Sequence, residues 1–165
     1  MFWPTQKLAC EFLYVFCRFE YALKRTSFLK KGQGGGAEPN WDRFSAVLDK
    51  EMKSMETESN EFHEAVGYFF NHPPKKQIVN EEGHLEWKDE IIPEDQRNFG
   101  KLLMLVRRVR NNLFHGGKVR GEYIYGSERD EELIKSGLVI LMGCLRFSAE
   151  VEREFKQEVF NVYET

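Results

Sequence analysis

Apolar residues recur every three or four positions through most of this chain, and this spacing constrains its fold more than any other feature. Between residues 5 and 29 the spacing predicts one long amphipathic helix. Its apolar face consists of Leu8, Phe12, Val15, Phe16, Phe19 and Leu23. The same spacing predicts further helices that begin near Asn40, near Asn60, at Pro93 and near Glu128.

Glycine and proline mark the ends of these helices. The glycine-rich segment 31–36 is expected to be a flexible loop, and it lacks the Gly-Lys-Ser/Thr that a phosphate-binding loop requires. Pro73 and Pro74 end the third predicted helix. Residues 76–88 contain two short extended pieces around a turn near Gly83, which predicts a small β-hairpin inserted between helices.

The last helical region is too long to stay unbroken in a compact domain. From Glu128 it would extend for about 36 residues, or roughly 54 Å, whereas a domain of this size is about 40 Å across. We expect the helix either to break, near Gly143 or Ser148, or to project and pack on something else. The sequence therefore predicts one all-α domain over residues 1–165, a four- to five-helix bundle with a hairpin near 76–88.

Length and composition favour one soluble domain of a cytoplasmic protein. The 165 residues have 41% hydrophobic content, and no apolar run approaches the roughly 20 residues that span a membrane. The first helix carries charges inside its apolar run, which disfavours a signal peptide. Three cysteines without metal-type spacing, Cys10, Cys17 and Cys144, are expected to be reduced and buried.

Charge is distributed unevenly along the chain. The net charge of −3 disfavours a protein that coats nucleic acid by bulk electrostatics. Between Gln96 and Gly121, however, there is no acidic residue. This basic zone contains Arg97, Lys101, Arg107, Arg108, Arg110, Lys118 and Arg120. Two interpretations remain open: a helix face whose cations pair with acids elsewhere in the fold, or an anion-binding site.

The end of the fourth predicted helix carries the side chains best suited to chemistry. Asn111 lies four residues before His115 and can share its face. Arg110 converges with them if the helix loosens at Gly116-Gly117. A guanidinium matches phosphate oxygens, and an imidazole exchanges protons near neutral pH. The alternative is that His115 caps the helix and Arg110 forms a surface ion pair.

The run Arg110-Asn111-Asn112-Leu113-Phe114-His115-Gly116 resembles the motif of HEPN domains, in which a histidine follows an arginine after four to six residues. The position also resembles that family, because the motif lies on a late helix of a bundle and another long helix follows. The resemblance implies a HEPN-type bundle that forms a homodimer with facing motifs. It also implies a metal-independent endoribonuclease that needs no cofactor, often a toxin or antiviral effector with a cognate antitoxin.

For this chain the resemblance implies that Arg110, Asn111 and His115 are the catalytic residues. RNA contacts are expected from Arg107, Arg108, Lys118 and Arg120. Glu20, beside the apolar face of the first helix, is a supporting candidate whose partner is Arg110 or Arg107, or else a member of an ordinary structural ion pair. The competing functions are a non-catalytic module that binds RNA or nucleotide, and a dimerisation scaffold.

Overall fold

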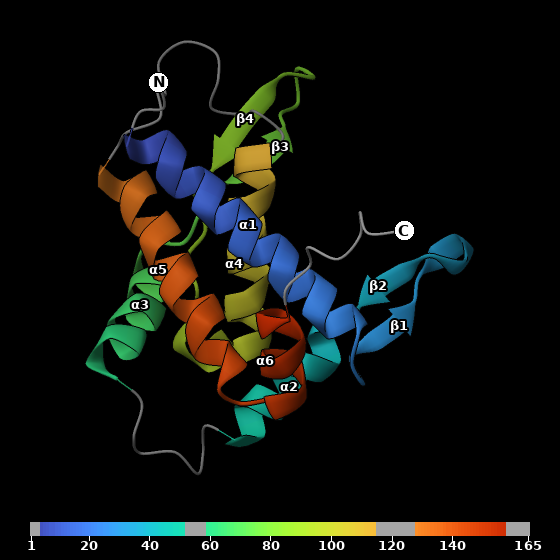
Figure 1. Ribbon diagram of the computed structural model, residues 1–165. Helices are drawn as coiled ribbons and strands as arrows, with labels where there is room; N and C mark the ends of the chain where they lie inside the picture. The colour runs from blue at the N-terminus through green and yellow to red at the C-terminus, as the bar shows by residue number, and fades with distance from the viewer. Residues whose placement is uncertain (1–3, 52–58, 115–127, 158–165) are drawn as a thin grey trace.

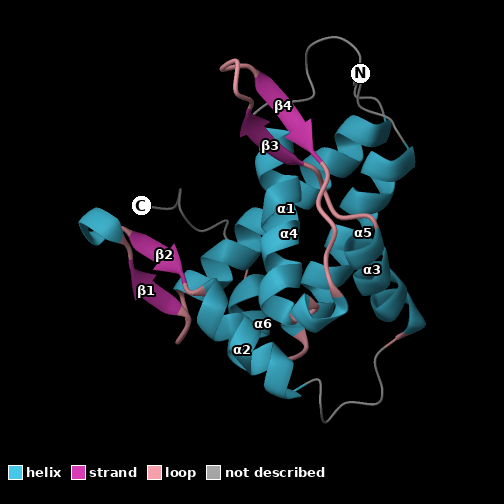
Figure 2. Cartoon of the chain, turned by 180° about the vertical axis from the view of Figure 1, so that it is seen from behind, coloured by secondary structure: helices cyan, strands magenta, loops and turns pink. Residues whose placement is uncertain are grey.

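The computed structural model describes residues 4–51, 59–114 and 128–157, and in this part of the chain six α-helices surround a common core (Figure 1). The helices are α1 (Pro4–Lys24), α2 (Trp41–Glu51), α3 (Asn60–Asn71), α4 (Phe99–Phe114), α5 (Glu128–Leu145) and α6 (Ala149–Lys156). Two antiparallel hairpins, β1 (Leu29–Lys31) with β2 (Ala37–Pro39) and β3 (Lys76–Val79) with β4 (Leu85–Lys88), project from separate ends of the helical body (Figure 2). The prediction of a helical bundle is confirmed, but the described residues form six helices and not four or five, because the last helical region is divided into α5 and α6.

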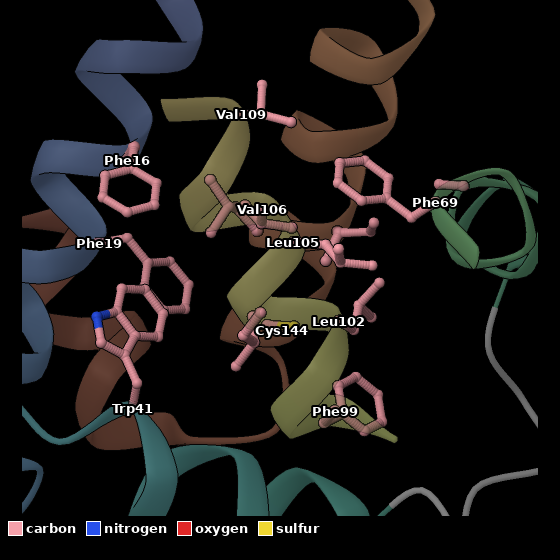
Figure 3. Packing of buried hydrophobic residues seen from close by; sticks show 14 of the residues in the cluster. Phe16, Phe19, Trp41, Phe69, Phe99, Leu102, Leu105, Val106, Val109 and Cys144 are labelled. Carbon is pink, nitrogen blue, oxygen red and sulfur yellow. The ribbon is translucent and has the colours of Figure 1, made fainter. Parts of the chain in front are cut away.

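The core is built from the apolar faces of α1 and α4. Phe12, Phe16 and Phe19 of α1 are almost completely buried, and they belong to the same apolar cluster as the leucines of α4. Figure 3 shows α1 and α3 on opposite sides of α4, with Trp41 of α2 packed beneath Phe19. The long helix α1 also contacts α5 and α6, while α2 packs on α4. This arrangement fixes the positions of α1, α2 and α4 around the site described below.

The apolar residues whose spacing predicted the fourth helix form the buried face of α4. Leu102, Val106 and Val109 are at most 5% exposed. The start of the helix differs from the prediction, because Pro93 precedes a short 3-10 helix, η3 (Glu94–Gln96), and α4 begins only at Phe99. Asn98 explains this start, since its side-chain oxygen accepts a hydrogen bond of 2.9 Å from the backbone N–H of Lys101.

The hairpin predicted near 76–88 is confirmed as β3 and β4. Their antiparallel register pairs residue 76 with 88 and residue 79 with 85. Asn80 holds the turn, because its side-chain oxygen accepts hydrogen bonds from the backbone N–H groups of Glu82 (3.1 Å) and His84 (2.9 Å). Gly83 follows with φ of +81°, a conformation that costs glycine little.

The loop predicted at 31–36 forms the tip of the β1–β2 hairpin, which the sequence analysis did not predict. Gly32 and Gly36 are joined by a backbone hydrogen bond of 2.7 Å, and Gly34 and Gly35 have φ of +74° and +87°. Gly34 and Gly35 therefore supply the left-handed conformations that reverse the chain. This hairpin brings its strand residues to the mouth of a cavity beside α4.

The expected break in the last helical region lies between α5 and α6. The first helix of the pair ends at Leu145 and the second begins at Ala149. Arg18 of α1 holds the end of α6, because its Nη2 donates to the carbonyl oxygens of Phe155 at 2.7 Å and Gln157 at 2.6 Å. An unbroken last helix would have projected from the domain and needed another molecule to pack on. Because α5 and α6 are separate helices, this reason to expect a second copy no longer applies.

The cysteine prediction is only partly right. Cys144 is buried, whereas Cys10 and Cys17 are exposed on α1, because they lie on the side of the helix opposite its phenylalanine face. Among the described residues, no helix combines the length and the apolar character that crossing a membrane requires.

Candidate functional site

Arg110, in the last turn of α4, is the centre of the candidate site. Its guanidinium lies over two aromatic rings, 5.4 Å from the centroid of Phe16 and 5.6 Å from that of Phe114. Aromatic ring faces attract cations, so these rings hold the guanidinium without occupying its N–H groups. Nη1 donates a hydrogen bond of 2.9 Å to the side-chain oxygen of Asn111. The side chain of Arg110 remains 31% exposed.

Glu20 supplies a counter-charge to this arginine from a distant part of the chain. Its Oε2 lies 3.7 Å from Nη2 of Arg110, and its side chain is 25% exposed. The sequence left open whether Arg110 or Arg107 would be the partner, and the structure places Arg110 there. At 3.7 Å the contact is an ion pair and not a close hydrogen bond, so the guanidinium keeps donors for another ligand.

A cavity of about 350 Å³ opens beside this pair, between α1, α2, α4 and the β1–β2 hairpin. We call it the Arg110 cavity. It is lined by Phe16, Glu20, Lys30, Glu38, Pro39, Trp41, Asp42, Arg107, Arg110 and Asn111. The lining thus contains three cations, three carboxylates and two aromatic rings. Two of these cations already have a carboxylate partner: Arg110 pairs with Glu20, and Nζ of Lys30 lies 3.9 Å from Glu38.

Arg107 is the cation of this cavity with the least engagement. Its guanidinium lies 5.8 Å from the ring centroid of Trp41, and the residue is exposed. Within the described residues no carboxylate forms an ion pair with it. Trp41 itself is only 6% exposed and stacks on Phe19, with a centroid distance of 5.7 Å and an angle of 3°. The buried ring of Trp41 therefore supports the guanidinium of Arg107 at the edge of the cavity.

Arg108 follows Arg107 directly but faces another part of the protein. Its Nη1 donates to Glu90 at 2.5 Å and to the carbonyl oxygen of Pro74 at 3.1 Å. Lys101 donates to the other oxygen of Glu90 at 2.6 Å. The hydrogen bond from Lys101 lowers the pKa of Glu90 most, and the bond from Arg108 lowers it further against the effect of burial. Lys101 and Arg108 thus follow the first interpretation of the basic zone: both pair with an acidic residue outside it.

His115, Lys118 and Arg120 lie outside the described residues, so their expected roles remain predictions. His115 is the next residue after Phe114, which ends α4. Asn112, its neighbour in the motif, donates a hydrogen bond of 3.0 Å to the carbonyl oxygen of Lys75 and so ties the end of α4 to the segment before β3. Among the described residues no group of three histidine, cysteine or acidic side chains is arranged to hold a metal ion.

Sequence reasoning did not identify five residues of the Arg110 cavity: Lys30, Glu38, Pro39, Trp41 and Asp42. Lys30 and Glu38 were missed with the β1–β2 hairpin. The sequence predicted that a helix begins near Asn40, and the side-chain oxygen of Asn40 caps α2 by accepting a hydrogen bond of 3.1 Å from the backbone N–H of Arg43. That cap fixes where α2 begins, but only the packing of α2 on α4 places Trp41 and Asp42 beside the arginines.

Comparison with protein-family models, with curated proteins and with solved structures found no match for this chain.

Proposed function

We propose that this protein is a metal-independent endoribonuclease of the HEPN type, with Arg110, Asn111 and His115 at its active site. The observation that carries the proposal is the placement of Arg110 at the edge of a cavity, with part of its guanidinium uncommitted. The motif resemblance gives the reaction class, because a guanidinium and an imidazole are suited to phosphodiester cleavage through the 2′-hydroxyl of the RNA.

In the proposed reaction Arg110 binds the scissile phosphate. An arginine has five N–H donors, and its contacts with Asn111 and Glu20 leave several for phosphate oxygens. As the 2′-hydroxyl attacks, negative charge accumulates on the phosphate, and a fixed guanidinium stabilises it without rearrangement. Asn111 and Glu20 act as positioning residues that hold the guanidinium from two sides.

His115 transfers protons in this scheme. Cleavage requires one group that takes the proton of the 2′-hydroxyl and another that gives a proton to the leaving 5′-oxygen, each worth about 10²–10⁴ in rate. The motif holds one histidine, so the proposal includes a homodimer in which two copies of His115 act as base and acid. Light scattering at micromolar concentration should then report about twice the chain mass of 19.5 kDa, and a strict monomer would rule out the shared site.

One observation favours a second candidate, a non-catalytic module that binds a nucleotide or RNA. The Arg110 cavity contains the carboxylates of Glu20, Glu38 and Asp42 beside its cations, and such mixed charge suits recognition of a polar ligand as well as phosphate chemistry. A role as toxin or antiviral effector with an antitoxin partner belongs to the proposed enzyme and depends on the activity.

Incubation of the purified protein with labelled RNA in excess EDTA tests the proposal. We expect cleavage to persist and the 5′ product to end in a 2′,3′-cyclic phosphate. A strand with one 2′-deoxy nucleotide at the preferred site should bind nearly as well, because phosphate contacts dominate affinity, but should not be cut there. Equal cleavage of the deoxy strand, or a loss of activity in EDTA that magnesium restores, would overturn the mechanism. Binding without cleavage of any RNA would favour the module.

A further inference from the structure

A second cavity adjoins the Arg110 cavity along the groove between α2 and α4. It has a volume of about 480 Å³, within the range of ordinary ligand pockets. We call it the Asp95 cavity, and its polar walls include Trp41, Asp42, Ser45, Asp95, Asn98 and Arg107. The two cavities share Trp41, Asp42 and Arg107. A ligand whose phosphate is held at Arg110 therefore has room for its next unit in the Asp95 cavity.

One face of α4 extends along both cavities. Gly100, Met104 and Arg107 line the Asp95 cavity, and Arg107 with Asn111 lines the Arg110 cavity. Positions three or four residues apart lie on the same side of a helix, so this face forms a continuous wall. Arg107 and Arg110 are three residues apart on α4, and both line the Arg110 cavity. Two guanidiniums one helical turn apart can therefore bind the phosphates of one RNA strand.

Two donor groups on residues shared by the cavities have no ion-pair or hydrogen-bond partner in the described part of the chain. Arg107 forms no ion pair within the described residues, unlike Lys101 and Arg108, which share Glu90. The indole N–H of Trp41 is buried and, in the described part of the chain, has no hydrogen-bond acceptor. In Figure 3 this nitrogen lies on the edge of the ring turned away from Leu102 and Cys144. An unsatisfied buried donor costs about 1–3 kcal/mol, so the indole N–H of Trp41 favours a hydrogen-bond acceptor, and the exposed guanidinium of Arg107 favours an anion.

Two carboxylates line the Asp95 cavity, Asp42 at the junction and Asp95 beyond it. Asp42 lies in the first turn of α2 and Asp95 in η3, and ionised carboxylates only accept hydrogen bonds. Guanine presents an adjacent ring N–H and amino group, a pair of donors that one carboxylate can accept together. Uracil presents two carbonyl oxygens around a single N–H, and carboxylates repel such acceptors.

We propose that the Asp95 cavity binds a guanine base of single-stranded RNA next to the phosphate held at Arg110, with Asp42 and Asp95 selecting guanine over uracil and Arg107 binding the phosphate between the two cavities. This assignment rests on the proposed function and adds a base preference to it. A bidentate contact of this kind discriminates by about 1–3 kcal/mol, which corresponds to roughly 5- to 150-fold. Because Asp42 and Asp95 are exposed, we expect the lower part of that range, about 5- to 10-fold.

Binding of short 2′-O-methyl strands tests the base site independently of cleavage, because such strands cannot be cut through the 2′-hydroxyl. The probes are a tetrauridylate and three strands in which one internal uridine is replaced by G, A or C, measured by fluorescence anisotropy. The wild-type protein should bind the guanine strand about 5- to 10-fold more tightly than the tetrauridylate. The variants Asp42→Asn and Asp95→Asn should bring this ratio close to one. Glu61→Gln, which also removes an exposed carboxylate from a first helical turn, should leave the ratio unchanged.

Arg107→Ala should weaken binding of all four strands alike. It should also lower the slope of log affinity against log salt by about 0.7, the value for one lost phosphate contact on a single strand. Lys135→Ala, an exposed cation of α5, is the matched control and should leave both unchanged. Equal binding of the four strands, a ratio unchanged in both aspartate variants, or no binding of any strand would overturn the base site. A guanine preference without cleavage of normal RNA would refute only the ribonuclease, whereas cleavage without a preference would refute only the base site.

Discussion

Replacing Glu20 by glutamine separates a positioning role from an ordinary structural ion pair. The change keeps the shape of the side chain and removes the charge that lies 3.7 Å from Nη2 of Arg110. The Coulomb energy of such a pair is about 4 kcal/mol at an effective dielectric constant of 20 and about 1 kcal/mol in water. Both side chains are a quarter to a third exposed, so solvent screening leaves a net contribution of about 1 kcal/mol.

This magnitude predicts a small loss of stability and a larger change in RNA handling. A loss of about 1 kcal/mol lowers the Tm by about 2–4 °C in a chain of this length. Without the carboxylate, Arg110 no longer shares its charge, so RNA should bind several-fold more tightly. The guanidinium also loses one of the two groups that fix its orientation, so kcat should fall about tenfold, which corresponds to 1.4 kcal/mol.

The assay measures the Kd for a 2′-O-methyl strand and the kcat for normal RNA, with thermal unfolding in parallel. Glu11→Gln is the matched control, because Glu11 is exposed on the same helix and its removal changes the net charge by the same amount. Equal tightening in both variants would attribute the effect to bulk charge. An unchanged kcat in Glu20→Gln, with only a lower Tm, would refute the positioning role and leave a structural ion pair.

Three further predictions concern the motif, an ion pair and the packing of a glycine. Arg110→Ala and His115→Ala should each reduce RNA cleavage by at least about 100-fold and change the Tm by no more than about 4 °C; unfolding of either variant would support a structural cap instead. Glu90→Gln should destabilise the protein by about 2 kcal/mol at neutral pH, because it leaves two largely buried cations without their partner. The pKa of Glu90 is lowered in the folded state, so the wild-type advantage is present above the ordinary glutamate pKa and is lost as the pH falls through the lowered value; urea unfolding at several pH values should show the two proteins converge in acid, and a constant difference would contradict this cause. Gly143→Ala should cost about 1–3 kcal/mol in chemical denaturation, because the added Cβ would lie 2.3 Å from the buried ring of Phe62, and an unchanged midpoint would show that the ring can move.

The periodic part of the fold was predictable from local patterns. Apolar spacing of three and four predicted the buried faces of α1 and α4, because a helix of 3.6 residues per turn gathers such positions on one side. The turn around Gly83 predicted the β3–β4 hairpin. Strands of three residues are too short to show an alternating pattern, however, so β1 and β2 on either side of the predicted loop were missed. The prediction that all three cysteines are buried used only the residue type. Cys10 and Cys17 are exposed because their positions in the helical turn place them on the side of α1 that faces away from the core.

For the candidate site too, some features were predictable from local sequence and others depend on tertiary packing. The sequence determined that an arginine, an asparagine and a histidine occur together near the end of an amphipathic helix, because that is a matter of residue order and helical period. It assigned the same RNA-binding role to Arg107 and Arg108. Only the tertiary structure distinguishes them, since successive residues on a helix point about 100° apart and meet different neighbours: Arg107 lies over Trp41, whereas Arg108 pairs with Glu90. Likewise Glu20 meets Arg110 only because α1 packs on α4, and such a contact between distant segments leaves no periodic signal in the sequence.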